Sequence, residues 1–243
     1  MGGWSVEIDP AHSHGPRLAS FLDHGRPAAS LGLSHRSSAS NSGRLAATLA
    51  WLSAHAGKIV VVEGSYLARW NRMALEGASE GEASSGAASE ASAVRRRIER
   101  VLAESDSVSA GFLDWADLLG APEVCETIRA LGESGEADSG FRSALRREVD
   151  EYVARTRGTS DGSLSRETRG FLRSYVIEET AVLLDLQRRG YIVEAYHGPD
   201  LPLVRSVAAG RFPSLLPYSF PQRTHVSIRL TREMAKDPPS PEK

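Results

Sequence analysis

The chain has very little cysteine, with Cys125 as the single one in 243 residues. One cysteine cannot form an intrachain disulfide, and no set of Cys and His residues has the spacing of a zinc site. Apolar residues never run together for the roughly 18 positions of a membrane helix, and the N-terminus lacks the regions of a signal peptide. We therefore expect a cytoplasmic protein without disulfides, metal or a membrane span.

Neither sign of charge dominates the composition. The chain has 29 Lys and Arg against 31 Asp and Glu, which gives a net charge of -2 and an isoelectric point near 6.4. This balance excludes a uniformly basic nucleic-acid coat, although positive charge is concentrated in Arg95, Arg96, Arg97 and Arg100. Apolar residues make up 41% and charged residues 25%, which is ordinary for a globular protein and compatible with one domain.

Short apolar runs alternate with helical patterns, which predicts an α/β protein. Residues 28–33 form one such run, and the β-branched residues 59–62 are typical of a parallel strand that is covered on both faces. A helix is expected over residues 45–55, between the two. Strand, helix and strand imply a right-handed crossover and a doubly wound, mainly parallel sheet, in which ligands bind at the carboxyl ends of the strands.

The rest of the chain divides into segments of different character. We expect an irregular arm over residues 1–24, one α/β domain over 25–232 and a disordered tail over 233–243. Residues 76–93 are small and acidic, which predicts either a frayed helix start or a mobile loop. Further helices are expected over 94–102, near 122–131, over 141–156, 165–189 and 203–209, and further strands over 191–195 and 224–230.

The most informative pattern pairs Tyr175 with Glu179 on the long predicted helix. Four residues make about one helical turn, so the phenol and the carboxylate share a face. Tyr196 and His197 follow at the end of the next predicted strand. If the fold brings these side chains together, they form a site that can hold an amine and transfer its proton.

The environment of Glu179 has two interpretations. Its apolar helical neighbours would impose a large desolvation cost on the carboxylate unless it meets a cation or stays protonated, and a substrate ammonium is such a cation. Alternatively, Arg173, Glu178 and Glu179 form a solvated pattern along the helix. On the first interpretation Glu178 is the exposed neighbour.

Four motifs resemble, in their order and spacing, those of the cyclodipeptide synthases. They are Gly32-Leu33-Ser34 after the first strand, the helix with Arg95 to Arg100, Tyr175 to Glu179, and Tyr196-His197. The resemblance implies a Rossmann-like fold similar to the catalytic domain of class I aminoacyl-tRNA synthetases. It also implies a reaction that joins two amino acids, delivered by two aminoacyl-tRNAs, into a cyclic dipeptide. No HIGH-like or KMSKS-like segment for ATP-driven activation is present.

The resemblance also implies roles for individual residues. Ser34 would be the nucleophile that carries first the aminoacyl and then the dipeptidyl ester. Tyr175 and Glu179 would bind the amine and transfer its proton. Tyr196 would orient the intermediate and His197 would support the loop or the proton transfer; a Tyr packed in the core is the alternative for Tyr196.

Other residues would contact the amino acids. The resemblance places Ser30, Gly32, Val182 and Glu194 in the wall of the first amino-acid pocket, and Ser37 and Asn41 in the loop that follows the nucleophile. Glu194 would select a small or polar aminoacyl group. Alternatively, it points away from the pocket, because side chains alternate between the faces of a strand.

The nucleophile has two possible positions. Many members of the family carry Asn three residues after the nucleophilic Ser, with another Ser next. Here Ser37 stands three residues after Ser34, whereas Ser38 and Asn41 reproduce the family spacing four residues later. We prefer Ser34 because it directly follows the apolar strand, which places the chain in a branch that lacks this Asn; Ser38 is the alternative.

The arginines of the predicted helix over residues 94–102 indicate what the protein would bind. Arg95, Arg96, Arg97 and Arg100 would follow tRNA phosphates, although a solvated helix face is the alternative. The expected partners are two aminoacyl-tRNAs, without membrane, metal or cofactor, and a monomer is favoured. Two rival functions are a non-catalytic tRNA-binding protein on the same fold and a Rossmann-like esterase, which would need a His beside Ser34.

Overall fold

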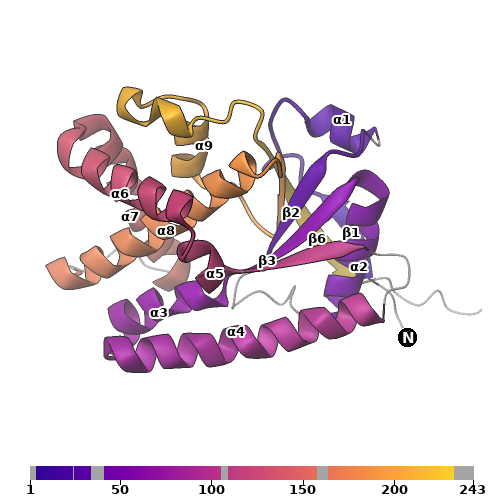
Figure 1. The fold of residues 1–243 in the computed structure, drawn as a ribbon, viewed down its shortest axis with the longest axis horizontal. Helices are drawn as coiled ribbons and strands as arrows, with labels where there is room; N and C mark the ends of the chain where they lie inside the picture. The colour runs from indigo at the N-terminus through magenta and orange to yellow at the C-terminus, as the bar shows by residue number, and fades with distance from the viewer. Residues whose placement is uncertain (1–3, 24, 34–40, 105–108, 158–163, 233–243) are drawn as a thin grey trace, which may run out of the picture.

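The computed structural model describes residues 4–23, 25–33, 41–104, 109–157 and 164–232 and shows a twisted sheet with helices on both faces (Figure 1). The strands are β1 (Trp4–Ile8), β2 (Ala28–Leu33), β3 (Lys58–Glu63), β4 (Ala110–Asp114), β5 (Val193–Tyr196) and β6 (Thr224–Arg232). Their order across the sheet is β1-β6-β5-β2-β3-β4. Within the described ranges every pairing is parallel except that of β1 with β6. The predicted doubly wound α/β class is confirmed.

Helices cover the two faces of the sheet in separate layers. They are α1 (Leu18–Leu22), α2 (Ser42–His55), α3 (Ala68–Asn71), α4 (Glu80–Ala103), α5 (Trp115–Leu119), α6 (Pro122–Ala137), α7 (Ser139–Arg157), α8 (Arg166–Arg188) and α9 (Pro202–Ala208). One core contains buried residues of α1, α2 and α4, and the other contains buried residues of α5 to α9. Residues of β2 alternate between these cores, so Leu31 faces α2 whereas Gly32 faces α8.

The acidic, low-complexity segment belongs to a regular helix rather than to a loop. Ser79 and Glu82 form a capping box at the start of α4, in which each side chain bonds the other residue's backbone N–H. Ala83, Ala87 and Ala91 then continue the buried stripe of the C-terminal half of the helix. Because alanine has the highest helix propensity and fits a close contact, residues 80–93 extend the helix that begins at 94 in the sequence prediction.

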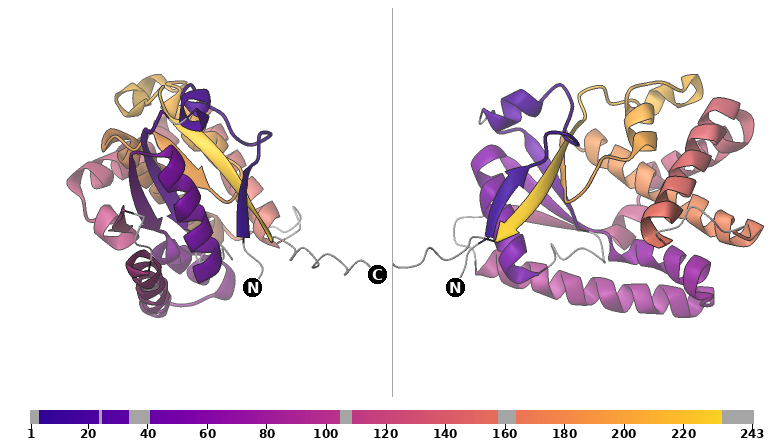
Figure 2. Two further views of the ribbon diagram at one scale, coloured as in Figure 1. Left: turned by 90° about the vertical axis from the view of Figure 1, so that its right-hand side faces the viewer. Right: turned by 180° about the vertical axis from the view of Figure 1, so that it is seen from behind.

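The predicted irregular arm over residues 1–24 is wrong in part. Residues Trp4–Ile8 form edge strand β1, which pairs antiparallel with β6, as Figure 2 shows from behind. Phe21 of α1 is fully buried beneath the sheet. An edge strand of five residues among His, Gly and Pro gives little periodic signal, so its pairing partner more than 200 positions away decides its conformation.

Some predicted features lie outside the described residues, namely Ser34, Ser37 and Ser38, the turn over 158–162 and the tail over 233–243. Among the helices that the structure describes, none combines the length and the apolar character needed to cross a membrane.

Candidate active site

The candidate site lies at the end of β2, the strand from which the sheet extends in both directions. From β2 the sheet continues through β3 to β4 on one side and through β5 to β6 on the other. Such a switch point leaves a crevice at the carboxyl ends of the central strands. Leu33 is the last residue of β2, and Tyr196 is the last residue of the neighbouring β5.

The ring of Tyr196 packs closely against two glycines. A Cβ atom added at Gly32 would lie 3.2 Å from Cδ2 of Tyr196, and one added at Gly198 would lie 3.0 Å from its Cε1. Both distances are tighter than ordinary contacts, so larger side chains would displace the ring. Glycine at position 32 therefore has a physical reason, because it lets the aromatic ring of Tyr196 approach β2 closely.

Helix α8 brings Tyr175 and Glu179 to the same place. Its N-terminus is capped by Ser165, as the sequence predicts, and Gly190 follows its end with φ of +89°. Tyr175 and Glu179 line a small cavity together with Gly32 and Tyr196. The three segments on which the predicted site depends thus converge.

Two cavities meet at this site. The smaller has a volume of about 50 Å³, and its other lining residues are Leu33, Val62, Gly64, Leu67, Trp115, Leu183, Glu194, Pro199 and Leu201. The larger has a volume of about 320 Å³, and is lined by Tyr152, Arg155, Thr156, His197, Gly198, Pro199 and Leu201 together with Glu179 and Tyr196. Glu179 and Tyr196 therefore stand in the wall between the two cavities.

The electrostatics of the site centre on Glu179. Burial, followed by the nearby carboxylates of Glu148 and Glu194, raises the pKa of Glu179 to about 8, and Arg155 offsets only part of this. Glu179 keeps some accessible surface and lines both cavities. Burial and the charge of Glu179 also raise the pKa of Tyr175. At neutral pH the carboxyl group of Glu179 is thus mostly protonated.

The solvated pattern of Arg173, Glu178 and Glu179 is not found. Glu178 accepts hydrogen bonds from Arg69 at 2.5 Å and from the indole nitrogen of Trp70 at 2.9 Å. Its side chain is 12% exposed, so the prediction of an exposed neighbour is wrong. Arg173 pairs instead with Glu136 at 2.7 Å.

His197 is positioned in the wall of the larger cavity. Burial lowers the pKa of His197 to about 4, so its ring is neutral at physiological pH. Its Nε2 atom has no hydrogen-bond partner in the part of the chain that the structure describes. A neutral imidazole can accept or donate a hydrogen bond there, but it does not supply a positive charge.

Two predicted pocket residues have other places. Val182 is fully buried in the core, and its neighbour Leu183 lines the smaller cavity instead. Asn41 is the N-cap of α2, where its side-chain oxygen accepts a hydrogen bond from the backbone N–H of Gly43 at 3.1 Å. Asn41 is not among the residues that line either cavity.

Several lining residues escape the sequence analysis, among them Tyr152, Arg155 and Trp115. Tyr152 and Arg155 come from α7, and Trp115 begins α5. The ring of Tyr152 packs against that of Tyr175 in a tilted arrangement, with centroids 4.6 Å apart. The sequence places Tyr152 and Arg155 on a predicted helix, but it does not show that this helix packs against α8.

Glu194 points toward the cavity, yet its charge is already paired. Its Oε2 accepts a hydrogen bond from Arg223 at 2.5 Å, and its Oε1 lies 3.7 Å from Nδ1 of His225. Burial acts to raise the pKa of Glu194. The charge of Arg223, followed by the hydrogen bond and charge of His225, outweighs burial and lowers this pKa, so the group is ionised. The alternative in which Glu194 faces away from the pocket is excluded by its position in the cavity wall.

Arg223 joins this strand to the loop that follows it. The guanidinium also donates to both carboxylate oxygens of Asp200, at 2.6 and 2.8 Å, and Asp200 contacts Nε2 of His14 at 2.8 Å. Nε2 of His225 lies 3.0 Å from the carbonyl oxygen of Gly198. The network fixes the loop from residue 197 to 201, which carries part of both cavity walls.

This network also contains metal-ligand types. Single ligand atoms of Glu194, Asp200 and His225 lie within 4.8 Å of one another. However, the guanidinium of Arg223 is bonded to both carboxylates and neutralises them. A metal ion would have to displace a buried arginine, so we interpret the cluster as structural.

Replacing Arg223 by Met is expected to lower the free energy of unfolding by about 3–5 kcal/mol, because two buried carboxylates lose their cation. Urea denaturation at pH 7 measures the change. Arg229→Met is the matched control: Arg229 lies on β6, which begins one residue after Arg223, and pairs with Asp9, but its side chain is 64% exposed. That control should lose less than about 1 kcal/mol, and equal losses in the two variants would contradict the role of the buried network.

The arginines of the predicted basic helix face outward on α4. Arg95, Arg96 and Arg100 are exposed and Arg97 is partly buried, whereas Val94 and Ile98 pack inward. Arg95 pairs with Glu99 at 2.9 Å. The outward orientation of this stripe is confirmed, and its role in RNA binding stays a prediction.

A model of the family described as cyclodipeptide synthase matches residues 15–212. The chain belongs to the cyclodipeptide synthase family. This match spans most of the described fold and all the segments that meet at the site. A search of curated proteins finds no match to this cyclodipeptide synthase.

Solved structures agree with the family assignment at the level of the fold. A cyclodipeptide synthase of Fluoribacter dumoffii superposes with a TM-score of 0.78 at 14% identity, covering 96% of this chain and all of that one. A Mycobacterium tuberculosis protein, described as showing that these enzymes are related to type I tRNA synthetases, gives 0.71 at 18% identity, with 93% of each chain covered. The enzyme of Candidatus Glomeribacter gigasporarum, bound to Phe-tRNAPhe, gives 0.61 at 20% identity, with 93% of this chain and 96% of that one covered.

Proposed function

We propose that this cyclodipeptide synthase joins two amino acids, each delivered by an aminoacyl-tRNA, through ester intermediates on Ser34. The observation that carries the proposal is the convergence of Tyr175, Glu179 and Tyr196 at the carboxyl end of β2. Ser34 follows directly in the chain, although it lies outside the described residues. The tRNA-bound structure of the Glomeribacter enzyme supports tRNA as the carrier.

The proposed reaction balances without ATP, because both esters are already activated. Ser34 Oγ attacks the first aminoacyl ester, and the released ribose hydroxyl takes the proton. The amine of this aminoacyl-enzyme attacks the second aminoacyl-tRNA ester. The second tRNA leaves with its ribose hydroxyl protonated, and a dipeptidyl ester remains on Ser34. The new terminal amine then attacks that ester, so the ring closes and the serine hydroxyl is restored.

Each attacking amine must first lose a proton, and Glu179 is the proposed acceptor. An α-ammonium group has an ordinary pKa near 8, and the pKa of Glu179 is also raised to about 8. Matched values permit proton transfer in both directions. In this proposal Tyr175 bonds the same amine, and Tyr196 orients the intermediate with the support of neutral His197. The lining of the smaller cavity by Tyr175 and Tyr196, and of the larger one by Tyr196 and His197, supports these roles.

Finer assignments belong to the same proposal. Ser37 at the position of the usual Asn supports membership of the branch that lacks this Asn. Ser37 would contribute to the substrate loop, and a monomer is the favoured state. Because aminoacyl-tRNAs are made and used in the cytoplasm, we place the reaction there.

Expression in a bacterial host tests the function. We expect a diketopiperazine in the medium, detected by mass spectrometry and absent from cells with the empty vector. If the purified protein binds aminoacyl-tRNA but no cyclic dipeptide forms, the non-catalytic alternative is correct. Hydrolysis of small esters without tRNA would instead support the esterase.

Charge reversal on α4 tests the basic helix. Arg96→Glu together with Arg100→Glu is expected to weaken tRNA binding by about tenfold or more at moderate salt, because exposed arginines neutralise phosphates. The slope of log affinity against log salt should also fall by about 0.7–0.9 for each lost contact. Filter binding over a salt series measures both quantities, and unchanged affinity and slope would remove α4 from the RNA surface.

A further inference from the structure

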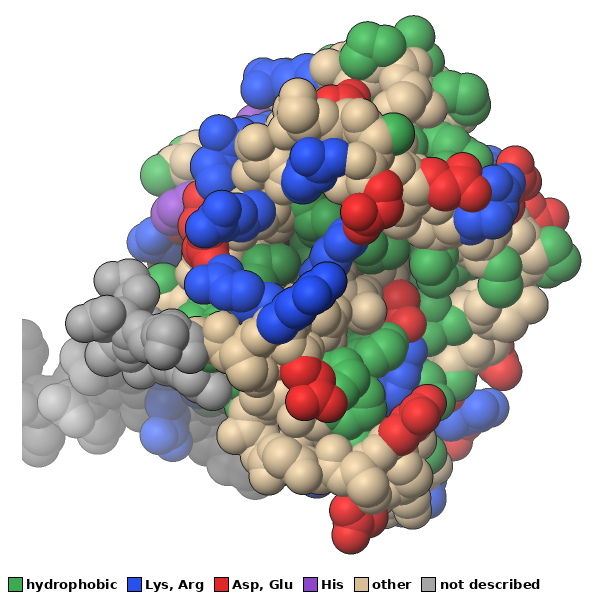
Figure 3. Space-filling view, turned by 90° about the vertical axis from the view of Figure 1, so that its left-hand side faces the viewer, with side chains coloured by type: hydrophobic (Ala, Val, Ile, Leu, Met, Phe, Trp, Pro, Cys, Tyr) green, Lys and Arg blue, Asp and Glu red, His purple; other side chains and the backbone are tan. Residues whose placement is uncertain are grey.

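A pocket of about 220 Å³ lies between α7 and α8. Its lining residues are Arg142, Leu145, Arg146, Val149, Arg169 and Arg173. None of them lines either active-site cavity. Figure 3 views the molecule from the side of α6, α7 and the start of α8, where Lys and Arg side chains gather around hydrophobic ones. The pocket is thus separate from the site of the proposed chemistry.

The carboxylates around this pocket neutralise only part of its charge. Asp150 contacts Arg169 at 2.8 Å and Arg146 at 3.9 Å, and Glu136 contacts Arg173 at 2.7 Å. Both carboxylates are well exposed, at 49% and 73%. Four guanidinium groups face these two carboxylates, which leaves two positive charges in excess.

Arg142 differs from the other three arginines in its partners. Its Nε donates to the carbonyl oxygen of Gly135 at 2.9 Å, and its guanidinium also contacts the carbonyl of Glu136. Within the described residues it forms no ion pair. These bonds to the C-terminal end of α6 fix the guanidinium at the edge of the pocket, so its charge is held in place before any ligand binds.

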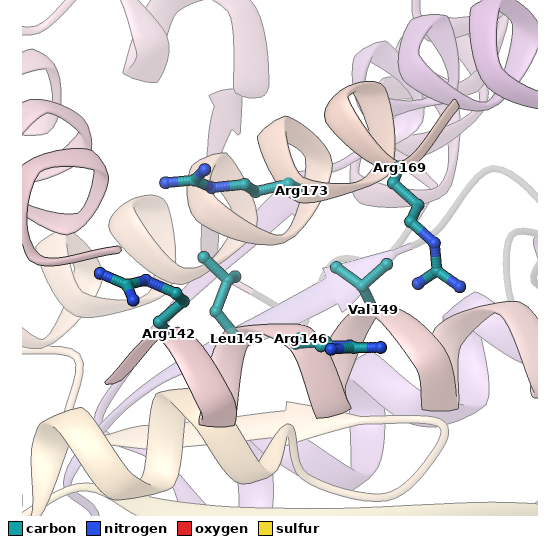
Figure 4. A pocket seen from close by; sticks show the side chains of 6 residues that line it. All are labelled: Arg142, Leu145, Arg146, Val149, Arg169 and Arg173. Atoms are coloured by element: carbon teal, nitrogen blue, oxygen red, sulfur yellow. The ribbon is translucent and has the colours of Figure 1, made fainter. Parts of the chain in front are cut away.

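The positive charges lie at two opposite ends of the pocket. Figure 4 shows Arg142 with Arg173 at one end and Arg146 with Arg169 at the other, and Leu145 and Val149 lie between them. A ligand that matches this arrangement carries one anion at each end and an uncharged middle that packs on an apolar floor.

We propose that this pocket binds one internal nucleotide of an RNA strand. Such a nucleotide has a phosphate on its 5′ side and another on its 3′ side, with an uncharged nucleoside between them. Arginine forks bind phosphates through paired hydrogen bonds, and their planes stack on bases. A free nucleoside mono-, di- or triphosphate carries its charge at one end only, so it leaves half of the pocket unmatched.

The RNA source is a separate question. The assignment of this strand to a tRNA substrate rests on the proposed function. The match between two phosphates and two arginine pairs does not depend on that function. An acidic peptide could also meet the arginines, because carboxylates accept the same paired hydrogen bonds as phosphates. The apolar floor between the two arginine pairs, and the planar guanidinium groups beside it, favour a ring flanked by two phosphates.

The test uses the full chain and the double variant Arg146→Gln with Arg169→Gln. These side chains are 78% and 40% exposed and share Asp150 as their ion-pair partner, so the fold should be retained. Arg129→Gln is the control, because Arg129 is 62% exposed and also pairs with a carboxylate, Glu133, but lies away from the pocket on α6. The probe is a fluorescent eight-nucleotide RNA of mixed sequence, with free nucleotides as competitors.

We expect the double variant to bind the RNA about tenfold more weakly, with a salt slope smaller by about 1. A nucleoside 3′,5′-bisphosphate should compete with RNA on the unchanged protein better than a 5′-monophosphate, and this advantage should vanish in the variant. Unchanged RNA binding in the variant, or an equal loss in Arg129→Gln, would overturn the proposal. Equal competition by the two nucleotides, or stronger competition by a polyglutamate peptide of matched charge, would overturn it as well.

Mass spectrometry of the medium separates this inference from the proposed function. If the unchanged chain makes no cyclic dipeptide but the variant loses RNA binding, the pocket assignment stands and the proposed function fails. If the product forms and the variant binds RNA normally, the function stands and the pocket assignment fails.

Discussion

Glu179→Gln is expected to reduce cyclic dipeptide formation by about 10²–10⁴-fold while the protein stays folded. Glutamine keeps the size of the side chain but cannot accept a proton, so the attacking amine stays protonated. Single-turnover assays with purified aminoacyl-tRNA measure the loss. Glu178→Gln is the matched control one position earlier: Glu178 binds Arg69 and Trp70 outside the cavities, so activity should stay within about threefold of the unchanged enzyme.

The same substitution is expected to change how stability depends on pH. The pKa of Glu179 is about 8 in the folded chain, above its ordinary value of 4.5, so the folded state binds this proton more tightly. The resulting stability is fully present below pH 4.5 and is lost as pH rises through 8. Gln does not titrate, so the variant should lose less stability than the unchanged protein across this window.

Urea denaturation at pH 5, 7 and 8.5 measures this difference. The buried carboxyl group of Glu63 also has a raised pKa, but it does not perturb Glu179 and is present in both proteins, so its contribution cancels. The coupling between Glu148 and Glu179 is part of the difference that the substitution removes. If both proteins lose the same free energy of unfolding between pH 5 and 8.5, Glu179 does not titrate as proposed. Retained activity in the Gln variant would show that another group accepts the proton.

Ser34→Ala is expected to abolish both the cyclic dipeptide and the covalent intermediate, whereas Ser38→Ala should retain both. Leu33 lines the smaller cavity, and the next Cα along any chain is only about 3.8 Å away. Ser34 follows Leu33 directly in the chain, whereas Ser38 is four residues further on. Incubation with aminoacyl-tRNA that carries a radiolabelled amino acid, followed by denaturing electrophoresis, detects the ester. A labelled Ser34→Ala protein and an unlabelled Ser38→Ala protein would move the nucleophile to Ser38.

The features that the sequence predicts well depend on near neighbours in the chain. Tyr175 and Glu179 share a helix face because they are four residues apart, and Ser165 caps that helix because its side chain reaches the N–H of Thr168. The β-branched run over residues 59–62 forms β3 for an equally local reason. In each case the residues that form the pattern and those that cause it lie within a few positions of one another in the sequence.

The features that the sequence does not reveal depend on distant partners. Glu178 is held by Arg69, 109 positions away, and Asp200 by His14, 186 positions away. Neither pairing leaves a periodic trace near the residues concerned. The exchange of Val182 for Leu183 in the cavity wall has a different origin: one residue turns a helix by about 100°, which is finer than a pattern of apolar residues resolves.

The partition between the two cavities has a consequence for altering the product. Apart from the shared wall at Glu179, Tyr196, Pro199 and Leu201, each chamber has its own set of lining side chains. Trimming Trp115 or Leu67 would enlarge one chamber, and changing Thr156 would reshape the other. A change in the lining that belongs to one chamber alone should therefore leave the other chamber unaltered, and variants from the two sides can be combined pairwise.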